Sequence, residues 1–150
     1  MIDTRITGDV RLHVIRTAME RSTVPTARET ASSLRISPDQ AIEAYRILAE
    51  SHVYVLEPGD PTRLRMANPF SAVTTAYQVE ASGKRYYGNC VWDGLGIVAL
   101  MGGTGCLKTA CSDCGEALTV TVSDGILAGA EGVVHFSVPA AHWRDDIIHT

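Results

Sequence analysis

Hydrophobic residues fall at helical intervals through the first third of the chain. From Val10 to Met19 they recur at helical spacing and predict a first helix. Thr26 with Glu29 further along matches a capping box and predicts a second helix. Ser37 followed by Pro38, an N-cap before a proline at the first helical position, predicts a third.

The pattern changes to short β-like runs directly after the third helix. Residues 53–56 and 62–66 are rich in β-forming side chains, and the proline and glycine of residues 57–61 separate them as a turn. Three helices followed by such a hairpin indicate a winged helix-turn-helix region, which we place at residues 1–68.

Beyond residue 68 the chain has the pattern of strands around one helix. The expected elements are a hairpin of residues 75–80 and 84–87, a buried helix at 92–100, and strands at 117–123 and 133–138. The predicted fold class is therefore α+β. A winged-helix-like three-helix module at residues 1–68 precedes a mixed sheet-and-helix core at residues 69–150.

Composition and charge narrow the possible functions. The 150 residues are 45% hydrophobic, enough for a core that needs no metal or disulfide to fold. The formal net charge of −4 argues against a protein whose main task is holding nucleic acid or an anionic membrane. The N-terminus shows no secretory signal pattern, and no apolar stretch reaches membrane-spanning length, so we expect a cytoplasmic protein.

The third predicted helix is poorly equipped for DNA, although the winged-helix pattern allows it. Arg46 is the only arginine or lysine between Ser37 and His52, whereas phosphate contacts by basic residues dominate protein–DNA affinity. Arg63 and Arg65 on the predicted wing are further basic candidates. DNA is therefore a disfavoured partner, and we interpret the module as a cover for a neighbouring site.

A thiol and a carboxylate lie close together in the aromatic, glycine-punctuated segment 86–96. One helical turn would place Cys90 and Asp93 on the same face. A thiolate is a soft nucleophile and a soft-metal ligand, and a carboxyl group can carry a proton. The pair could therefore bind a soft electrophile and protonate the departing group. The plain alternatives are a buried cysteine without chemistry and an acidic residue that stabilises a helix N-terminus.

In a reducing compartment, the four cysteines are expected to remain thiols, metal ligands or catalytic groups. Cys111 and Cys114 form a Cys-x-x-Cys knuckle that could present two thiolates to zinc, which prefers about four ligands. A reduced turn shaped by Gly115 is the alternative. The residues that could complete a metal site are Cys106, Cys90, His135 and His142.

Several segments together resemble the core of the alkylmercury (organomercurial) lyases. They are Phe70–Val73, the Cys-x-x-Asp-x-Leu block within Asn89–Ile97, Ala99–Gly102, Cys111–Gly115 and Leu118–Val120. The resemblance implies a winged-helix-like N-terminal segment and a lyase-type core. It also implies that Cys90 bonds the mercury of a small organomercurial substrate and that Asp93 delivers a proton to the departing carbon.

The same resemblance implies that catalysis needs no cofactor and leaves Hg(II) as the bound product. Low-molecular-weight thiols or a mercuric reductase would accept this Hg(II). The family's second cysteine aligns just beyond Thr150, so we expect either a truncated sequence or a shortened relative. In a shortened relative, Cys106, Cys111, Cys114 or an external thiol would have to substitute.

The leading hypothesis is protonolysis of a carbon–mercury bond, a step of mercury detoxification. The main alternative is a non-catalytic, thiol-based metal-binding or metal-sensing winged-helix regulator, which the missing second cysteine favours. A further alternative is a related enzyme that uses Cys90 and Asp93 as nucleophile and acid on another substrate.

Overall fold

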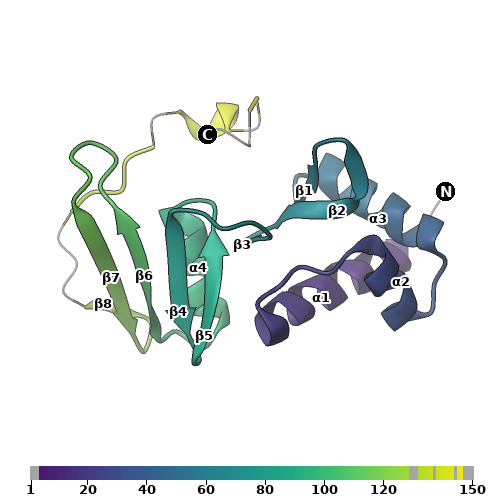
Figure 1. Cartoon of the computed structure of the whole chain (residues 1–150), viewed down its shortest axis with the longest axis horizontal. Coiled ribbons are helices and arrows are strands. Elements are labelled where there is room, and N and C mark those ends of the chain that lie inside the picture. Colours follow the sequence, from purple (N-terminus) through teal and green to yellow (C-terminus); the bar gives the residue numbers. More distant parts are fainter. Residues whose placement is uncertain (1–3, 129–131, 137, 144, 147–150) are drawn as a thin grey trace.

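Three helices form the N-terminal part of the chain, where the sequence pattern predicts them (Figure 1). The computed structural model describes residues 4–128, 132–136, 138–143 and 145–146. The three helices are α1 (Thr4–Arg21), α2 (Ala27–Leu34) and α3 (Pro38–Glu50). α1 begins ahead of the predicted apolar stretch, because its first turns are largely exposed and carry little hydrophobic signal.

Side-chain caps fix where α2 and α3 begin. The hydroxyl of Thr26 accepts a hydrogen bond from the backbone N–H of Glu29, whose carboxylate accepts one from the backbone N–H of Thr26 at 2.7 Å. Ser37 and Gln40 form the equivalent reciprocal pair at the start of α3. Each cap satisfies N–H groups that the helix leaves unpaired, which contributes about 1 kcal/mol. The predicted capping box is confirmed.

A small antiparallel sheet follows the helices. Its strands, in spatial order, are β1 (Tyr54–Glu57), β2 (Asp60–Ala67) and β3 (Phe70–Ser71). The first hydrophobic cluster, which includes the buried Val14, Tyr45, Tyr54 and Leu64, joins this sheet to the helices. Three helices and a hairpin are thus present as predicted. Their assignment as a winged helix stays a prediction.

A second antiparallel sheet carries α4 (Val91–Leu100) on one face (Figure 1). Its strands are β4 (Tyr77–Ala81), β5 (Lys84–Gly88), β6 (Gly105–Ala110), β7 (Ala117–Ser123) and β8 (Ile126–Ala128), in the order β5-β4-β6-β7-β8. Gly94 lets α4 approach closely, because a Cβ there would lie 2.7 Å from Cδ1 of Leu107. Leu107 and Ile97 lie in the second hydrophobic cluster. The predicted α+β class is confirmed.

The strands differ from the sequence prediction at β3, β6 and β8, which it does not contain, and at residues 133–138. The sequence pattern does not predict β6, because its residues alternate weakly and follow a glycine-rich turn, although Leu107 is fully buried there. The predicted strand at residues 133–138 is wrong, since 133–136 and 138 lie outside strands and β8 pairs with β7 instead. Val133 is 93% exposed and Phe136 packs against Trp143 in the C-terminal segment, so this apolar run is not held against the sheet as a strand. Residue 137 lies outside the described residues.

The C-terminal segment continues beyond β8 with little regular structure. It contains a short 3-10 helix, η1 (Ala140–His142). Figure 1 shows this segment in yellow, crossing the top of the view between the two sheets. Within the described ranges, no helix combines the length and apolar character needed to cross a membrane.

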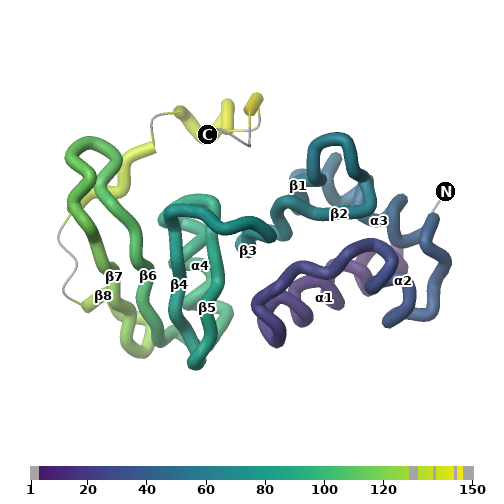
Figure 2. Tube along the Cα trace, in the orientation of Figure 1, coloured from purple at the N-terminus to yellow at the C-terminus, as the bar shows by residue number. Residues whose placement is uncertain are grey.

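One helix belongs to both hydrophobic clusters. Val14 of α1 lies in the first cluster, whereas Ala18 lies in the second. At the end of α1, the backbone oxygen of Met19 accepts a hydrogen bond from the Tyr86 hydroxyl at 2.7 Å, and that of Glu20 accepts one from Lys84 Nζ at 2.6 Å. Figure 2 shows α1 ending beside β5. The division predicted between residues 68 and 69 stays a prediction, and α1 links the parts on either side of it.

Two glycine substitutions should change stability in opposite directions. A Cβ at Gly105 would lie 2.6 Å from the backbone oxygen of Glu80 on the paired strand, so Gly105→Ala should destabilise the fold. We expect a loss of about 1–3 kcal/mol, as for other overpacked sites. Gly8 lies on the exposed side of α1 with nothing within 4 Å of a Cβ. Gly8→Ala should therefore stabilise by about 0.5–1 kcal/mol through helix propensity.

Urea unfolding of the two variants beside the wild-type chain measures both free energies of unfolding. Equal effects of the two substitutions would show that the approach of β4 to β6 is looser than the structure describes.

Candidate active site

Cys90 and Asp93 meet at the first turn of α4. Cys90 is the N-cap residue, and its Sγ accepts a hydrogen bond from the backbone N–H of Asp93 at 3.4 Å. The Oδ2 atom of Asp93 accepts one from the backbone N–H of Asn89 at 3.2 Å. The spacing in the sequence thus brings thiol and carboxylate together, as expected. Their catalytic roles stay predictions.

Gly88, the last residue of β5, allows the helix to begin this close to the strand. A Cβ at Gly88 would lie 2.9 Å from the backbone nitrogen of Gly94 and 3.1 Å from Cβ of Asp93. Real Cβ atoms do not approach backbone atoms this closely. Any side chain at this position would therefore displace the turn that carries Cys90 and Asp93.

Both members of the pair hold their protons more tightly than they would in water. Burial is the largest cause that raises the pKa of Asp93, and the backbone N–H of Asn89 opposes it. Burial also raises the pKa of Cys90; the backbone N–H of Asp93 lowers it, and the nearby carboxylate of Asp93 raises it again. The Cys90 side chain in turn lowers the pKa of Asp93, but burial outweighs it, so the pair can store a proton to a higher pH than an exposed carboxyl group.

The side-chain amide of Asn89 faces the same carboxylate. It lies close enough to Asp93 to lower that group's pKa, but without the geometry of a hydrogen bond. Its Nδ2 atom is buried and has no hydrogen-bond partner among the described residues. Buried amide donors are rarely left unpaired. Asn89 can therefore donate to the Asp93 carboxylate after a small movement, or to a ligand beside it.

The pair opens into a cavity of about 330 Å³. Three parts of the chain form its wall: the region of β1 and β2, the start of α4, and the C-terminal segment. The lining residues are His52, Tyr54, Val55, Met66, Asn68, Asn89, Cys90, Trp92, Asp93, Phe136 and Trp143. This volume is at the lower end of the range for small-molecule sites.

Several aromatic side chains line this cavity. The rings of Phe136 and Trp143 pack with centroids 4.8 Å apart, and Trp143 Nε1 donates to the backbone oxygen of Val138 at 2.7 Å. Trp92 is 67% exposed although it lines the cavity. The sequence indicates Trp92 only as part of an aromatic segment and gives no signal for a role of Phe136 or Trp143 at this site. No local pattern connects these distant positions, so only the fold shows that they share a wall.

The other predicted thiol ligands lie elsewhere. Cys106 is on β6, and its Sγ lies 4.0 Å from Oε2 of Glu80, beside a separate hollow of about 780 Å³. Cys111 and Cys114 are in the loop between β6 and β7. All three are free thiols, and none lines the Cys90 cavity. The backbone N–H groups of Cys114 and Asp113 lower the pKa of Cys111.

No complete zinc site is assembled in the described part of the chain. There, no group of three or more histidine, cysteine, aspartate or glutamate side chains is placed to hold a metal ion. Nδ1 of His142 instead contacts Oδ2 of Asp145 at 3.0 Å, and His135 is exposed. The proposed completion of the Cys111/Cys114 knuckle by these residues therefore finds no support in the geometry.

Comparison with known proteins identifies a matching family and a solved structure with a similar fold. The MerB family model, described as alkylmercury lyase, matches residues 70–149. A solved structure described as the mercury-bound form of MerB2 shares the fold with a TM-score of 0.66 and 19% sequence identity. The match covers 85% of this chain and 60% of that chain. No curated protein sequence matches significantly.

The rate at which each cysteine is alkylated should depend on the pKa of its thiol. Near neutral pH, iodoacetamide should modify Cys111 before Cys90, because backbone N–H groups lower the pKa of Cys111 whereas burial raises that of Cys90. In Asp93→Asn, the pH midpoint for Cys90 alkylation should move to lower pH, since the carboxylate that opposes the thiolate is gone. Peptide mass spectrometry over a pH series measures each cysteine separately.

Asp124→Asn provides the matched control, because Asp124 lies in the exposed turn before β8 and does not line the Cys90 cavity. If the Cys90 midpoint is the same in Asp93→Asn as in the wild type, the two groups do not share a proton.

Proposed function

Because this chain belongs to the alkylmercury lyase family, we propose that it cleaves carbon–mercury bonds of small organomercurials by protonolysis. The observation that carries the proposal is the placement of Cys90 and Asp93 on one helical turn, facing an apolar cavity. This reaction needs a soft thiolate for the metal and a stored proton for the carbon. The cavity supplies both.

The first proposed step is capture of the metal. The Cys90 thiol gives its proton to the Asp93 carboxylate, and the resulting thiolate bonds mercury while the exchangeable ligand of R–Hg–X leaves. The N–H of Asp93 stabilises this thiolate. A proton transferred in this way stays within the pair and is not lost to solvent.

The second proposed step breaks the carbon–mercury bond. A further thiolate adds to mercury and raises its electron density, which weakens the bond to carbon. The electron pair of that bond stays with carbon, and the protonated Asp93 gives its proton to it. The products are R–H and Hg(II) held between two sulfurs. The raised pKa of Asp93 suits a group that must hold a proton until this moment.

The second thiolate would come from outside the described chain. Cys106, Cys111 and Cys114 do not line the cavity, so none of them can join Cys90 on the same mercury atom without a rearrangement. We propose an external low-molecular-weight thiol, which also removes the Hg(II) product in solution or passes it to a mercuric reductase. No catalytic cofactor enters this scheme.

The N-terminal region would contribute one wall of the site through β1 and β2, and its helices would support that wall and not bind DNA. Nε of Arg46 donates to Glu43 at 2.9 Å, and its guanidinium also pairs with Glu50. The only basic side chain of α3 is thus already neutralised on the helix. This arrangement favours a winged-helix-like unit that covers the cavity over the metal-sensing regulator.

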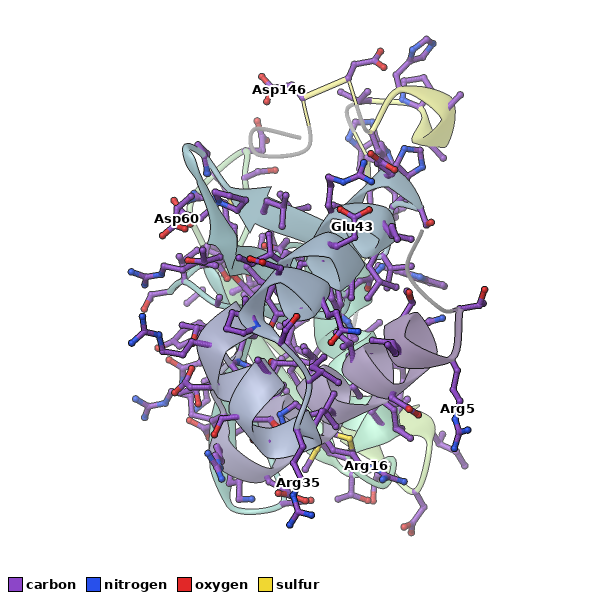
Figure 3. All side chains as sticks on the ribbon, turned by 90° about the vertical axis from the view of Figure 1, so that its right-hand side faces the viewer. Arg5, Arg16, Arg35, Glu43, Asp60 and Asp146 are labelled. Carbon is purple, nitrogen blue, oxygen red and sulfur yellow. The ribbon has the colours of Figure 1, made fainter. Side chains whose placement is uncertain are left out.

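The exposed face of this N-terminal part carries charges of both signs. Figure 3 labels Arg16 and Arg35 near the bottom of the view and Glu43 and Asp60 above them. A surface that attracts the phosphate backbone would need clustered positive charge. The mixed charges agree with a structural role for this part of the chain.

Single-turnover release of benzene from a phenylmercury salt in excess monothiol tests the proposal. The wild-type chain should release benzene, Cys90→Ala should release none above the thiol-only background, and Asp93→Asn should slow release by about 10²–10⁴-fold through loss of the proton donor. Gas chromatography of the headspace measures the product. Cys106→Ala is the matched control, since it removes a thiol that lies outside the cavity.

Stoichiometric mercury binding through Cys90 without any benzene release would argue for metal capture alone. Equal release by the wild type and both site variants would place the chemistry elsewhere.

A further inference from the structure

The loop between β6 and β7 holds two cysteines in one tight turn. The strands pair up to Ala110 and Ala117, and the backbone N–H of Cys111 donates to the oxygen of Glu116 at 2.8 Å. The N–H of Gly115 donates back to the oxygen of Cys111 at 2.9 Å. Cys114 lies inside the turn that these bonds close, so the hairpin holds both thiols at its tip.

Both thiols of this turn are accessible from solvent. Cys114 is exposed and Cys111 is partly exposed. Two accessible cysteines separated by two residues in one tight turn are the elements of a metal-binding knuckle.

The number of available ligands decides which metal suits this knuckle. Tetrahedral zinc requires about four protein ligands in a structural site, and the described residues bring no third or fourth side chain to this pair. A soft cation that is satisfied by two thiolates does not require them. The loop therefore fits such a cation better than it fits zinc.

We infer that Cys111 and Cys114 form a chelating site for a soft, two-coordinate cation, and that Hg(II) is the cation that this site binds. Binding forms two metal–sulfur bonds. The two thiol protons pass to the buffer and the two ligands that the cation carried leave with their electron pairs, so no oxidant or reductant is needed. The site is separate from Cys90, because neither cysteine lines that cavity.

The topology places this loop at the same end of the sheet as Cys90. β5 and β6 each run antiparallel to β4, which lies between them, so the C-terminal ends of β5 and β6 lie at one end. Cys90 follows β5 and the loop follows β6 (Figure 2). The role of the pair rests on the proposed function: Hg(II) leaving Cys90 would be taken up by exchange onto this exposed pair before it leaves the protein.

The test uses inorganic Hg(II) and the full chain with Cys90→Ser, which removes the thiol of the cavity. Protein is equilibrated with HgCl₂ and a free monothiol at about 10 μM, roughly a hundredfold below the millimolar effective concentration of a tethered thiol. After gel filtration, the mercury bound per chain is measured by elemental mass spectrometry. The expected result is one Hg(II) per chain, because a chelating pair outcompetes a monothiol and a single cysteine does not.

The matched variants each remove one further thiol from this parent. Adding Cys111→Ser or Cys114→Ser should reduce retained mercury at least about tenfold, to the level of a single thiol. Adding Cys106→Ser should leave retention unchanged, since that thiol has no second cysteine beside it in a turn. Circular dichroism checks that each variant keeps its fold.

Three outcomes would overturn the inference: no retention by the Cys90→Ser parent, undiminished retention after Cys114→Ser, or equally tight retention of Zn(II) in the same competition. None of these depends on carbon–mercury cleavage, because the probe contains no carbon–mercury bond. A failure here would leave the proposed lyase reaction intact, and a failure of benzene release would leave this metal site intact.

Discussion

The site depends on one close approach, between the end of β5 and the first turn of α4. Gly88 has no side chain to separate them, and a Cβ there would lie 2.9 Å from the backbone of the helix. The chain therefore turns from strand to helix within two residues, and the thiol of Cys90 becomes the N-cap. Backbone hydrogen bonds then fix both sulfur and carboxylate without help from distant side chains.

Burial raises the pKa of both Cys90 and Asp93, which the local geometry of the turn alone would not do. An exposed Asp93 at a helix start would be ionised, since N–H groups and the helix dipole favour its charge. The wall contributed by β1, β2 and the C-terminal segment removes solvent from the pair, and burial becomes the largest influence on the pKa of both groups. The pKa values of the pair thus depend on the assembled cavity, whereas the positions of the two side chains depend only on the first turn of α4.

The sequence predicted the features that are local and missed those that are not. The caps at Thr26 and Ser37 and the closeness of Cys90 to Asp93 follow from spacings of a few residues, and the structure contains all of them. β6 escaped prediction because a central strand is identified by its neighbours, and Leu107 is buried by elements distant in sequence. The apolar residues near Val133 suggested a strand, but pairing with β7 is taken by β8. Phe136 and Trp143 reached the cavity through tertiary contacts that no periodicity records.

Helix α1 limits how far the cavity can open. It is a rod of about 27 Å, with one portion packed in the first cluster and its last turn hydrogen-bonded to Tyr86 and Lys84 on β5. A motion that widens the cavity by parting the two clusters must either bend this rod or release its last turn from β5. The length of α1 and the hydrogen bonds from Tyr86 and Lys84 to its last turn therefore resist any such opening.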